Sequence, residues 1–200
     1  QKNIFTSYGY VYDAINGSKD VINSSNFYWD SIQKVYYVRN KKYSKIKPEN
    51  EVFGWHPYWM GSAWESYPFE LLSTISYFSY KLDPNTGSYT NPKQMNEWRN
   101  TAMIDSAKLK NTKVLLTVSS HGYKNNNSFL GDQAKWGVLI DSLSTLLLDR
   151  DADGVDINFE NLPYLKRGSF NRFIEELRKR LNQKFDSKSP IISLTLPAVD

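Results

Sequence analysis

The sequence predicts an α/β fold, the (β/α)8 TIM barrel, with only about the first five βα units present in these 200 residues. Apolar segments of strand length recur five times after residue 50, and amphipathic segments of helix length separate the later ones. Strands that alternate with helices form a parallel sheet with the helices outside it. Five such units in about 150 residues extrapolate to eight in about 250, the usual size of this barrel.

The predicted strands are short apolar runs. They cover residues 51–55, 72–80, 113–118, 154–159 and 191–196. Near-continuous apolar runs are typical of strands that are covered on both faces. A doubly wound open sheet is the competing fold, but it usually begins with a glycine-rich phosphate turn. No such turn follows the first predicted strand, because the chain continues His-Pro-Tyr-Trp from residue 56.

The predicted helices place apolar residues at the three- and four-residue spacing of one helix face. In residues 132–148 these are Trp136, Leu139, Ile140, Leu143, Leu146 and Leu147. In residues 170–181 they are Phe170, Phe173, Ile174, Leu177 and Leu181. Ser169 is the predicted N-cap of the second helix, because a serine hydroxyl accepts hydrogen bonds from the free N–H groups of a first turn. A further helix is predicted over residues 92–110.

The N-terminal part of the chain lacks this regularity. We interpret residues 1–48 as an N-terminal extension and residues 49–200 as the N-terminal part of the barrel. Alternating residues at 8–12 and 34–38 indicate short exposed strands, and Asn, Ser and Gly between residues 16 and 26 indicate turns.

Composition excludes several classes of protein. The chain has no cysteine, which excludes a disulfide framework, an iron–sulfur cluster and a thiolate zinc site. Its 25 basic residues are spread along the sequence, so we expect no nucleic-acid partner. No apolar run approaches the length of about 18 residues that a membrane span needs. With two histidines and no phosphate-loop or zinc-protease motif, the sequence predicts no metal and no cofactor.

An acidic segment over residues 149–160 allows three interpretations. The first is a calcium loop, because Asp149, Asp151, Asp153, Gly154 and Glu160 fit the spacing of an EF-hand. The exiting segment should then be helical, but a proline follows three residues after the glutamate and would break that helix. The second interpretation is a solvated acidic turn, which does not explain why apolar residues alternate with the polar ones.

The third interpretation is a buried strand over residues 154–160. Residues two apart on a strand share a face, so Asp156, Asn158 and Glu160 line the barrel interior while the apolar residues between them face the helices. Burying such a column is costly unless it is hydrogen-bonded or functional. Glu160 then lies at the carboxyl end of its strand, where barrel enzymes carry out their chemistry.

This segment resembles a known family signature. Residues 153–160, Asp-Gly-Val-Asp-Ile-Asn-Phe-Glu, resemble the DGxDxDxE motif of glycoside hydrolase family 18, the chitinase and endo-β-N-acetylglucosaminidase family. Residues 53–59, 75–80, 113–119 and 194–198 resemble the family's first, second, third and fifth strands. The resemblance therefore covers roughly residues 51–200 in the family's order.

The resemblance implies a retaining hydrolase of β-1,4 bonds next to N-acetylglucosamine, in which the substrate's own acetamide is the nucleophile. By position, Glu160 is the general acid, Asn158 orients the acetamide and Asp156 supports Asn158. Asp153 and Gly154 begin the motif as structural residues. The implied partners are N-acetylglucosamine-containing glycans, namely chitin, peptidoglycan or N-glycan cores. The implied location is secreted or at the cell surface.

Candidate sugar-binding residues lie at the ends of the first three predicted strands. Exposed aromatic rings can stack on sugars. The set comprises Trp55, Tyr58, Trp59, Trp64 and Tyr80, together with Ser119.

Three departures from the family pattern bear on activity. Asn158 stands where the family usually has Asp, so it supplies no negative charge to an oxazolinium ion. Ser-Ser-His-Gly at 119–122 replaces the family's S-x-G-G, and we interpret His121 as structural. The family's sixth-strand tyrosine and eighth-strand tryptophan lie beyond Asp200, so we expect residues 1–200 to belong to a longer polypeptide.

Two functions remain besides the calcium module. The first is the hydrolase, and the second is a non-hydrolytic glycan-binding protein that lost activity through Asn158. Retention of Glu160 favours the hydrolase, because family members without catalysis generally lose the acid.

Overall fold

The computed structural model describes residues 27–30, 35–38, 50–185 and 189–196. The chain divides into two compact units, residues 1–45 and 46–200. In the first unit, β1 (Phe27–Asp30) pairs antiparallel with β2 (Val35–Val38). The strand predicted near residues 34–38 is therefore confirmed, whereas the predictions for residues 8–12 and 16–26 lie outside the described residues.

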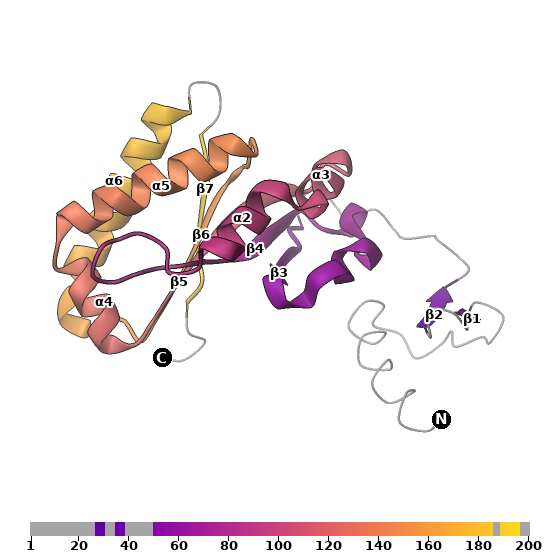
Figure 1. Cartoon of the computed structure of the whole chain (residues 1–200), viewed down its shortest axis with the longest axis horizontal. Coiled ribbons are helices and arrows are strands. Elements are labelled where there is room, and N and C mark those ends of the chain that lie inside the picture. Colours follow the sequence, from indigo (N-terminus) through magenta and orange to yellow (C-terminus); the bar gives the residue numbers. More distant parts are fainter. Residues whose placement is uncertain (1–26, 31–34, 39–49, 186–188, 197–200) are drawn as a thin grey trace. The chain divides into compact units, whose positions relative to one another are not determined.

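The second unit holds a parallel five-stranded sheet (Figure 1). Its strands are β3 (Phe53–Pro57), β4 (Thr74–Lys81), β5 (Lys113–His121), β6 (Gly154–Glu160) and β7 (Ile191–Leu194). Their spatial order is their order in the chain. A doubly wound sheet reverses its strand order part-way across, and a barrel does not. The strand order therefore favours the predicted barrel arrangement.

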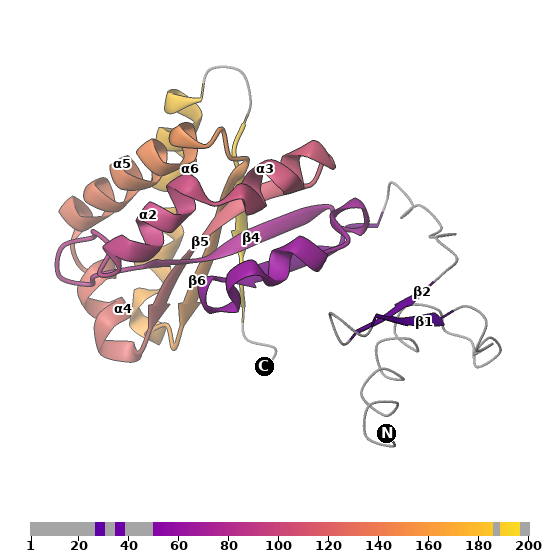
Figure 2. The same ribbon diagram turned by 45° about the vertical axis from the view of Figure 1, so that its right-hand side comes forward.

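The helices lie together on one face of this sheet (Figure 2). They are α2 (Pro92–Asn100), α3 (Ala102–Leu109), α4 (Tyr123–Leu130), α5 (Gln133–Asp149) and α6 (Arg167–Lys184). Short 3-10 segments precede β4 and α6; they are η2 (Tyr58–Ser66), η3 (Phe69–Leu71) and η4 (Tyr164–Lys166). No helix in the described part of the second unit is long and apolar enough to cross a membrane.

The core forms between the helices and the facing side chains of the strands. Val155, Ile157 and Phe159 of β6 are buried there. Phe159 stacks on Phe173 of α6 with ring centroids 5.9 Å apart, and Phe129 of α4 meets both rings edge-on. The apolar face predicted for residues 132–148 is confirmed, because all six of its residues are buried.

The helix boundaries differ from the sequence prediction in two places. The helix predicted over residues 92–110 is two helices, because Thr101 adopts an extended conformation and its hydroxyl accepts a hydrogen bond from the N–H of Met103. Ser169 is not an N-cap, because α6 already begins at Arg167. Helix α4 has no sequence signal, since most of its residues are polar and show no helical periodicity.

The acidic segment at the start of β6 joins other elements rather than forming a calcium loop. Asp149 pairs with Arg99 at 3.0 Å, and Asp151 pairs with Lys108 at 3.1 Å. The carboxylate of Asp153 accepts a hydrogen bond from a main-chain N–H of β5 at 2.8 Å. The three carboxylates therefore have three different partners. No cluster of three metal-binding side chains occurs among the residues that the structure describes, so the calcium interpretation is wrong.

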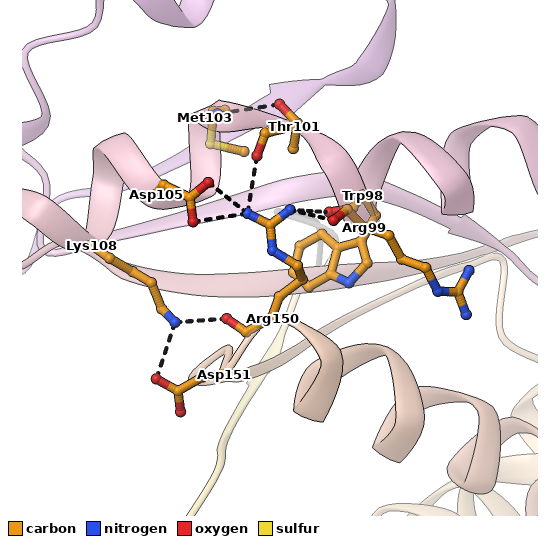
Figure 3. A network of polar contacts seen from close by, with 8 residues as sticks. All are labelled: Trp98, Arg99, Thr101, Met103, Asp105, Lys108, Arg150 and Asp151. Carbon is orange, nitrogen blue, oxygen red and sulfur yellow. Dashed lines mark hydrogen bonds and ion pairs between the residues drawn. The ribbon is translucent and has the colours of Figure 1, made fainter.

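Arg150, between two of these aspartates, ties α5 to α2 and α3 (Figure 3). Its side chain is 11% exposed and pairs with the carboxylate of Asp105 at 2.9 Å. The guanidinium also donates to the carbonyl oxygens of Trp98, Arg99 and Thr101 at 3.3, 2.6 and 3.1 Å. Carbonyls at a helix C-terminus have no partner within the helix, and a cation there is favoured by the helix dipole.

We expect Arg150→Ala to lower the free energy of unfolding by about 2 kcal/mol, because three partly buried carbonyl oxygens lose their charged donor together. Arg99→Ala is the matched control. Its ion pair with Asp149 is exposed, and such pairs contribute about 0–1 kcal/mol. Urea unfolding of both variants measures the difference. Equal losses in the two variants would contradict the role assigned to Arg150.

His56 on β3 belongs to the core rather than to the opposite face of the sheet. Its side chain is 1% exposed and packs against the rings of Tyr67 and Tyr77. Its Nδ1 lies 3.2 Å from the hydroxyl of Tyr67. Burial lowers the pKa of His56 below its ordinary value, because the charged imidazolium is poorly solvated there.

This burial predicts that the folded state loses stability as the pH falls below about 6.5, the pKa of an exposed histidine. Between the folded-state and unfolded-state pKa values the unfolded chain binds more protons, so acid favours unfolding. We expect the drop in Tm between pH 7.5 and pH 5.5 to shrink in His56→Gln. Tyr67→Phe, which keeps His56 buried, should retain the wild-type drop. An unchanged drop in His56→Gln would contradict this account.

Candidate active site

Polar side chains form three layers on the sheet face opposite the helices. Parallel pairing of β5 and β6 sets Thr117 opposite Asp156, Ser119 opposite Asn158, and His121 opposite Glu160. Because alternate residues of a strand share a face, these side chains form two parallel columns. The column of Asp156, Asn158 and Glu160 thus lies opposite the core, as the period of the strand predicts.

The lowest layer encloses Asp156, which is fully buried. Its carboxylate accepts hydrogen bonds from Trp55 Nε1 at 3.0 Å, Thr117 Oγ1 at 3.1 Å and Thr195 Oγ1 at 3.2 Å. These donors come from β3, from β5 and from the residue after Leu194 of β7. A buried carboxylate needs such donors to offset its lost hydration. Asp156 is therefore held rigidly by three neighbouring segments.

The middle layer contains an unsatisfied buried atom. Asn158 is 8% exposed, and its side-chain oxygen Oδ1 has no hydrogen-bond partner among the described residues. The neighbouring Ser119 is 3% exposed, and its hydroxyl lies 2.7 Å from the hydroxyl of Ser79 on β4. An unpaired buried carbonyl costs about 1–3 kcal/mol. Asn158 Oδ1 is therefore a buried acceptor to which none of the described residues donates.

The upper layer is open to solvent. Glu160 ends β6, and its side chain is 55% exposed. His121 ends β5, and its Nδ1 lies 3.3 Å from Glu160 Oε2. The layers therefore pass from a rigid buried carboxylate, through an unpaired amide oxygen, to an accessible carboxyl group. This order places a carboxyl group above a hydrogen-bond acceptor at the carboxyl edge of a parallel sheet.

The family model for "Glycosyl hydrolases family 18" matches residues 33–200. The chain belongs to glycosyl hydrolase family 18. A search of curated proteins finds no match.

Solved structures support the same fold for this family 18 chain. The class V chitinase from Nicotiana tobaccum is 15% identical with a TM-score of 0.62, over 73% of this chain and 44% of that one. A chitinase from Cycas revoluta in complex with (GlcNAc)3 is 16% identical with a TM-score of 0.60, over 71% and 44%. The Bacillus cereus spore cortex-lytic enzyme SleL is 16% identical with a TM-score of 0.57, over 73% and 35%.

The chain thus spans less than half the length of these solved structures. Its five-stranded parallel sheet with alternating helices matches part of the (β/α)8 barrels of family 18, which confirms the predicted fold class.

Two of the tryptophans predicted to contact sugar have exposed side chains in this family 18 chain. Trp55 is 46% exposed, although its indole nitrogen is bound to Asp156. Trp59, at the start of η2, is 63% exposed and meets Tyr58 and Phe78 edge-on. Tyr58 is half-buried against the core, so less of its ring is accessible.

Three other predicted contact residues are placed differently. Tyr80 is fully buried, and its hydroxyl donates to the carbonyl of Gly87 at 2.9 Å, so its predicted stacking role is wrong. The pairing of β4 with β5 shifts between Phe78 and Tyr80, and this irregularity turns Tyr80 toward the helices. Ser119 is buried beneath the open layer, and Trp64 packs partly against the core.

Asp153 and Gly154 contact the main chains of the neighbouring strands β5 and β7. Asp153 binds the main chain of β5, as described above. A Cβ atom at Gly154 would lie 2.0 Å from the carbonyl oxygen of Ile191 on β7, so a larger residue would push these strands apart. Both positions therefore set the register of β6 in the sheet.

Sequence reasoning missed two members of the site. Thr117 alternates with Ser119 in an otherwise apolar strand, and that alternation is a signal for a polar interior face. Thr195 has no comparable signal, because only the folded sheet brings β7 beside Asp156.

Proposed function

We propose that this chain forms part of a glycoside hydrolase that cleaves β-1,4 linkages next to N-acetylglucosamine with retention of configuration. The observation that carries the proposal is the buried oxygen of Asn158, which has no hydrogen-bond partner among the described residues and lies in one column with the exposed Glu160. A 2-acetamido group presents an N–H donor, which is the complement that this oxygen lacks.

The proposed reaction has two steps. Glu160 donates its proton to the glycosidic oxygen, while the carbonyl oxygen of the substrate's acetamide attacks the anomeric carbon and the glycosidic bond breaks. Water then attacks the anomeric carbon of the oxazolinium ion and gives its proton to Glu160, while the bond from that carbon to the acetamide oxygen breaks and the acetamide is restored. Asn158 accepts the acetamide N–H and orients the nucleophile. Asp156 supports Asn158 from the layer beneath and does not touch the substrate.

The proposed substrate is an N-acetylglucosamine oligosaccharide or polysaccharide. Chitinases among the similar structures hold (GlcNAc)3, and one similar structure is a spore cortex-lytic enzyme. Trp55 and Trp59 supply exposed rings beside the column for stacking on a sugar. Because such polymers lie outside the cell, we propose that the protein acts in a secreted or cell-surface form.

Hydrolysis of chitotetraose by the full-length protein, followed by proton NMR, tests this proposal. We expect the new reducing ends to appear first as the β-anomer, because two inversions at the anomeric carbon retain its configuration. Initial formation of the α-anomer, or no hydrolysis, would overturn the proposed mechanism.

A non-hydrolytic glycan-binding function is the second candidate, and the neutral Asn158 favours it, because an amide supplies no charge to the oxazolinium ion. Calorimetric binding of chitotetraose without turnover would establish this alternative.

A further inference from the structure

The end of β5, Gly122 and the first turn of α4 together contact both the main-chain carbonyl and the carboxyl group of Glu160. The side-chain amide of Asn126 donates from Nδ2 to the carbonyl oxygen of Glu160 at 2.6 Å. The N–H of Gly122 donates to the same oxygen at 3.2 Å. His121 Nδ1 lies 3.3 Å from Glu160 Oε2. One short segment therefore holds both ends of the residue proposed as the acid.

Asn126 is itself fixed in place. It lies in the first turn of α4, and none of its side chain is exposed. Its Oδ1 accepts a hydrogen bond from the hydroxyl of Ser120 at 2.7 Å. With Oδ1 occupied in this way, Nδ2 must face Glu160. The orientation of this amide is therefore set by the strand that pairs with β6.

The strand end needs such a support. Glu160 is the last residue of β6, and Asn161 after it adopts a positive φ of 59°, so the chain turns sharply there. The side chain of Glu160 is more than half exposed, and few contacts hold it in position. Fixing the carbonyl of Glu160 fixes the direction of its Cα–Cβ bond, and with it the reach of the carboxyl group.

We propose that Asn126 is a positioning residue for Glu160. It acts through the main chain of the acid and touches no substrate. The proposal rests on the proposed hydrolase function. It makes activity depend on Asn126, a residue outside the column of Asp156, Asn158 and Glu160.

The test uses Asn126→Asp in the full-length protein. Aspartate has nearly the same shape and still accepts from Ser120, but it sets an oxygen against the Glu160 carbonyl in place of the donor. Asn127→Asp is the matched control, because it makes the same chemical change at an exposed position of the same helix. Thermal melting checks that both variants fold.

Two substrates distinguish a misplaced Glu160 carboxyl group from a loss of folded protein. Chitotetraose needs a proton on its leaving oxygen, whereas a 4-nitrophenyl chitooligosaccharide releases an anion that leaves without one. We expect Asn126→Asp to lower kcat about 30-fold on chitotetraose and less than about 3-fold on the nitrophenyl substrate, with KM little changed. Asn127→Asp should keep the wild-type ratio of the two rates. A merely structural role would lower both rates equally, because it only reduces the folded fraction, and that outcome overturns the proposal.

A second readout does not depend on catalysis. Amide hydrogen exchange of the peptide that contains Gly122 should accelerate about tenfold in Asn126→Asp, because displacing the Glu160 carbonyl frees the Gly122 N–H. Unchanged exchange overturns the proposal. If the wild-type protein hydrolyses neither substrate, the proposed function fails, and the exchange measurement alone then decides whether Asn126 positions Glu160.

Discussion

Glu160→Gln is expected to lower kcat/KM on chitotetraose by about 10³-fold, within the range of general acid–base catalysis. Glutamine keeps the shape of the side chain but has no proton to donate to the leaving oxygen. The carboxyl group is exposed at the end of β6, so the change should leave the fold intact. Steady-state kinetics on the purified full-length protein, beside a thermal melt, measure the effect.

The matched control is Glu175→Gln, which makes the same chemical change at an exposed position on α6. We expect it to keep wild-type kcat/KM. Equal turnover by the wild type and Glu160→Gln would show that Glu160 is not the general acid. It would also contradict the interpretation of Asp156, Asn158 and Glu160 as a catalytic column.

Asn158→Asp is expected to raise kcat on chitotetraose by about tenfold or more. A carboxylate at this position still accepts the acetamide N–H and also supplies negative charge to the oxazolinium ion, a form of electrostatic stabilisation that is often worth 10²-fold or more. Burial of Asn158 strengthens this effect, because charges interact more strongly away from water. Single-turnover kinetics would show the gain in the chemical step.

Asn158→Asp should also lower the stability of the fold. A carboxylate placed two residues from the buried Asp156 on one strand face brings two like charges together, so we expect a lower Tm. Asn127→Asp, which adds the same charge at an exposed position on α4, serves as the control and should change neither quantity. A fall in kcat for Asn158→Asp would show that the site is adapted to a neutral amide. Turnover that appears only in this variant would favour the glycan-binding function for the natural chain.

Much of this architecture follows from sequence periodicity. The alternation of Val155, Ile157 and Phe159 with Asp156, Asn158 and Glu160 predicts one face toward the helices and one away, and the structure has that arrangement. Such local rules work because a strand has a side-chain period of two, whatever it packs against. The helix spacing in residues 132–148 is equally local.

Local rules fail where a contact joins distant residues. Tyr80 follows the strand pattern, yet a shift in pairing between β4 and β5 turns it into the core. The spacing of the aspartates before β6 fits a calcium loop, yet Arg99 and Lys108 from other helices take two of those carboxylates. In both cases the residues that decide the outcome lie far away in the sequence, so local patterns do not reveal them.

The sequence by itself determined the class of fold and the column of Asp156, Asn158 and Glu160, because both follow from the periodicity of single strands and helices. Only the tertiary structure decided which side chains of that column have hydrogen-bond partners. Trp55, Thr117 and Thr195 come from three separate segments to bind Asp156, and no partner in the described chain reaches the oxygen of Asn158. The physical reason is that a hydrogen bond depends on atoms meeting within about 3 Å, and the packing of separate strands sets that distance.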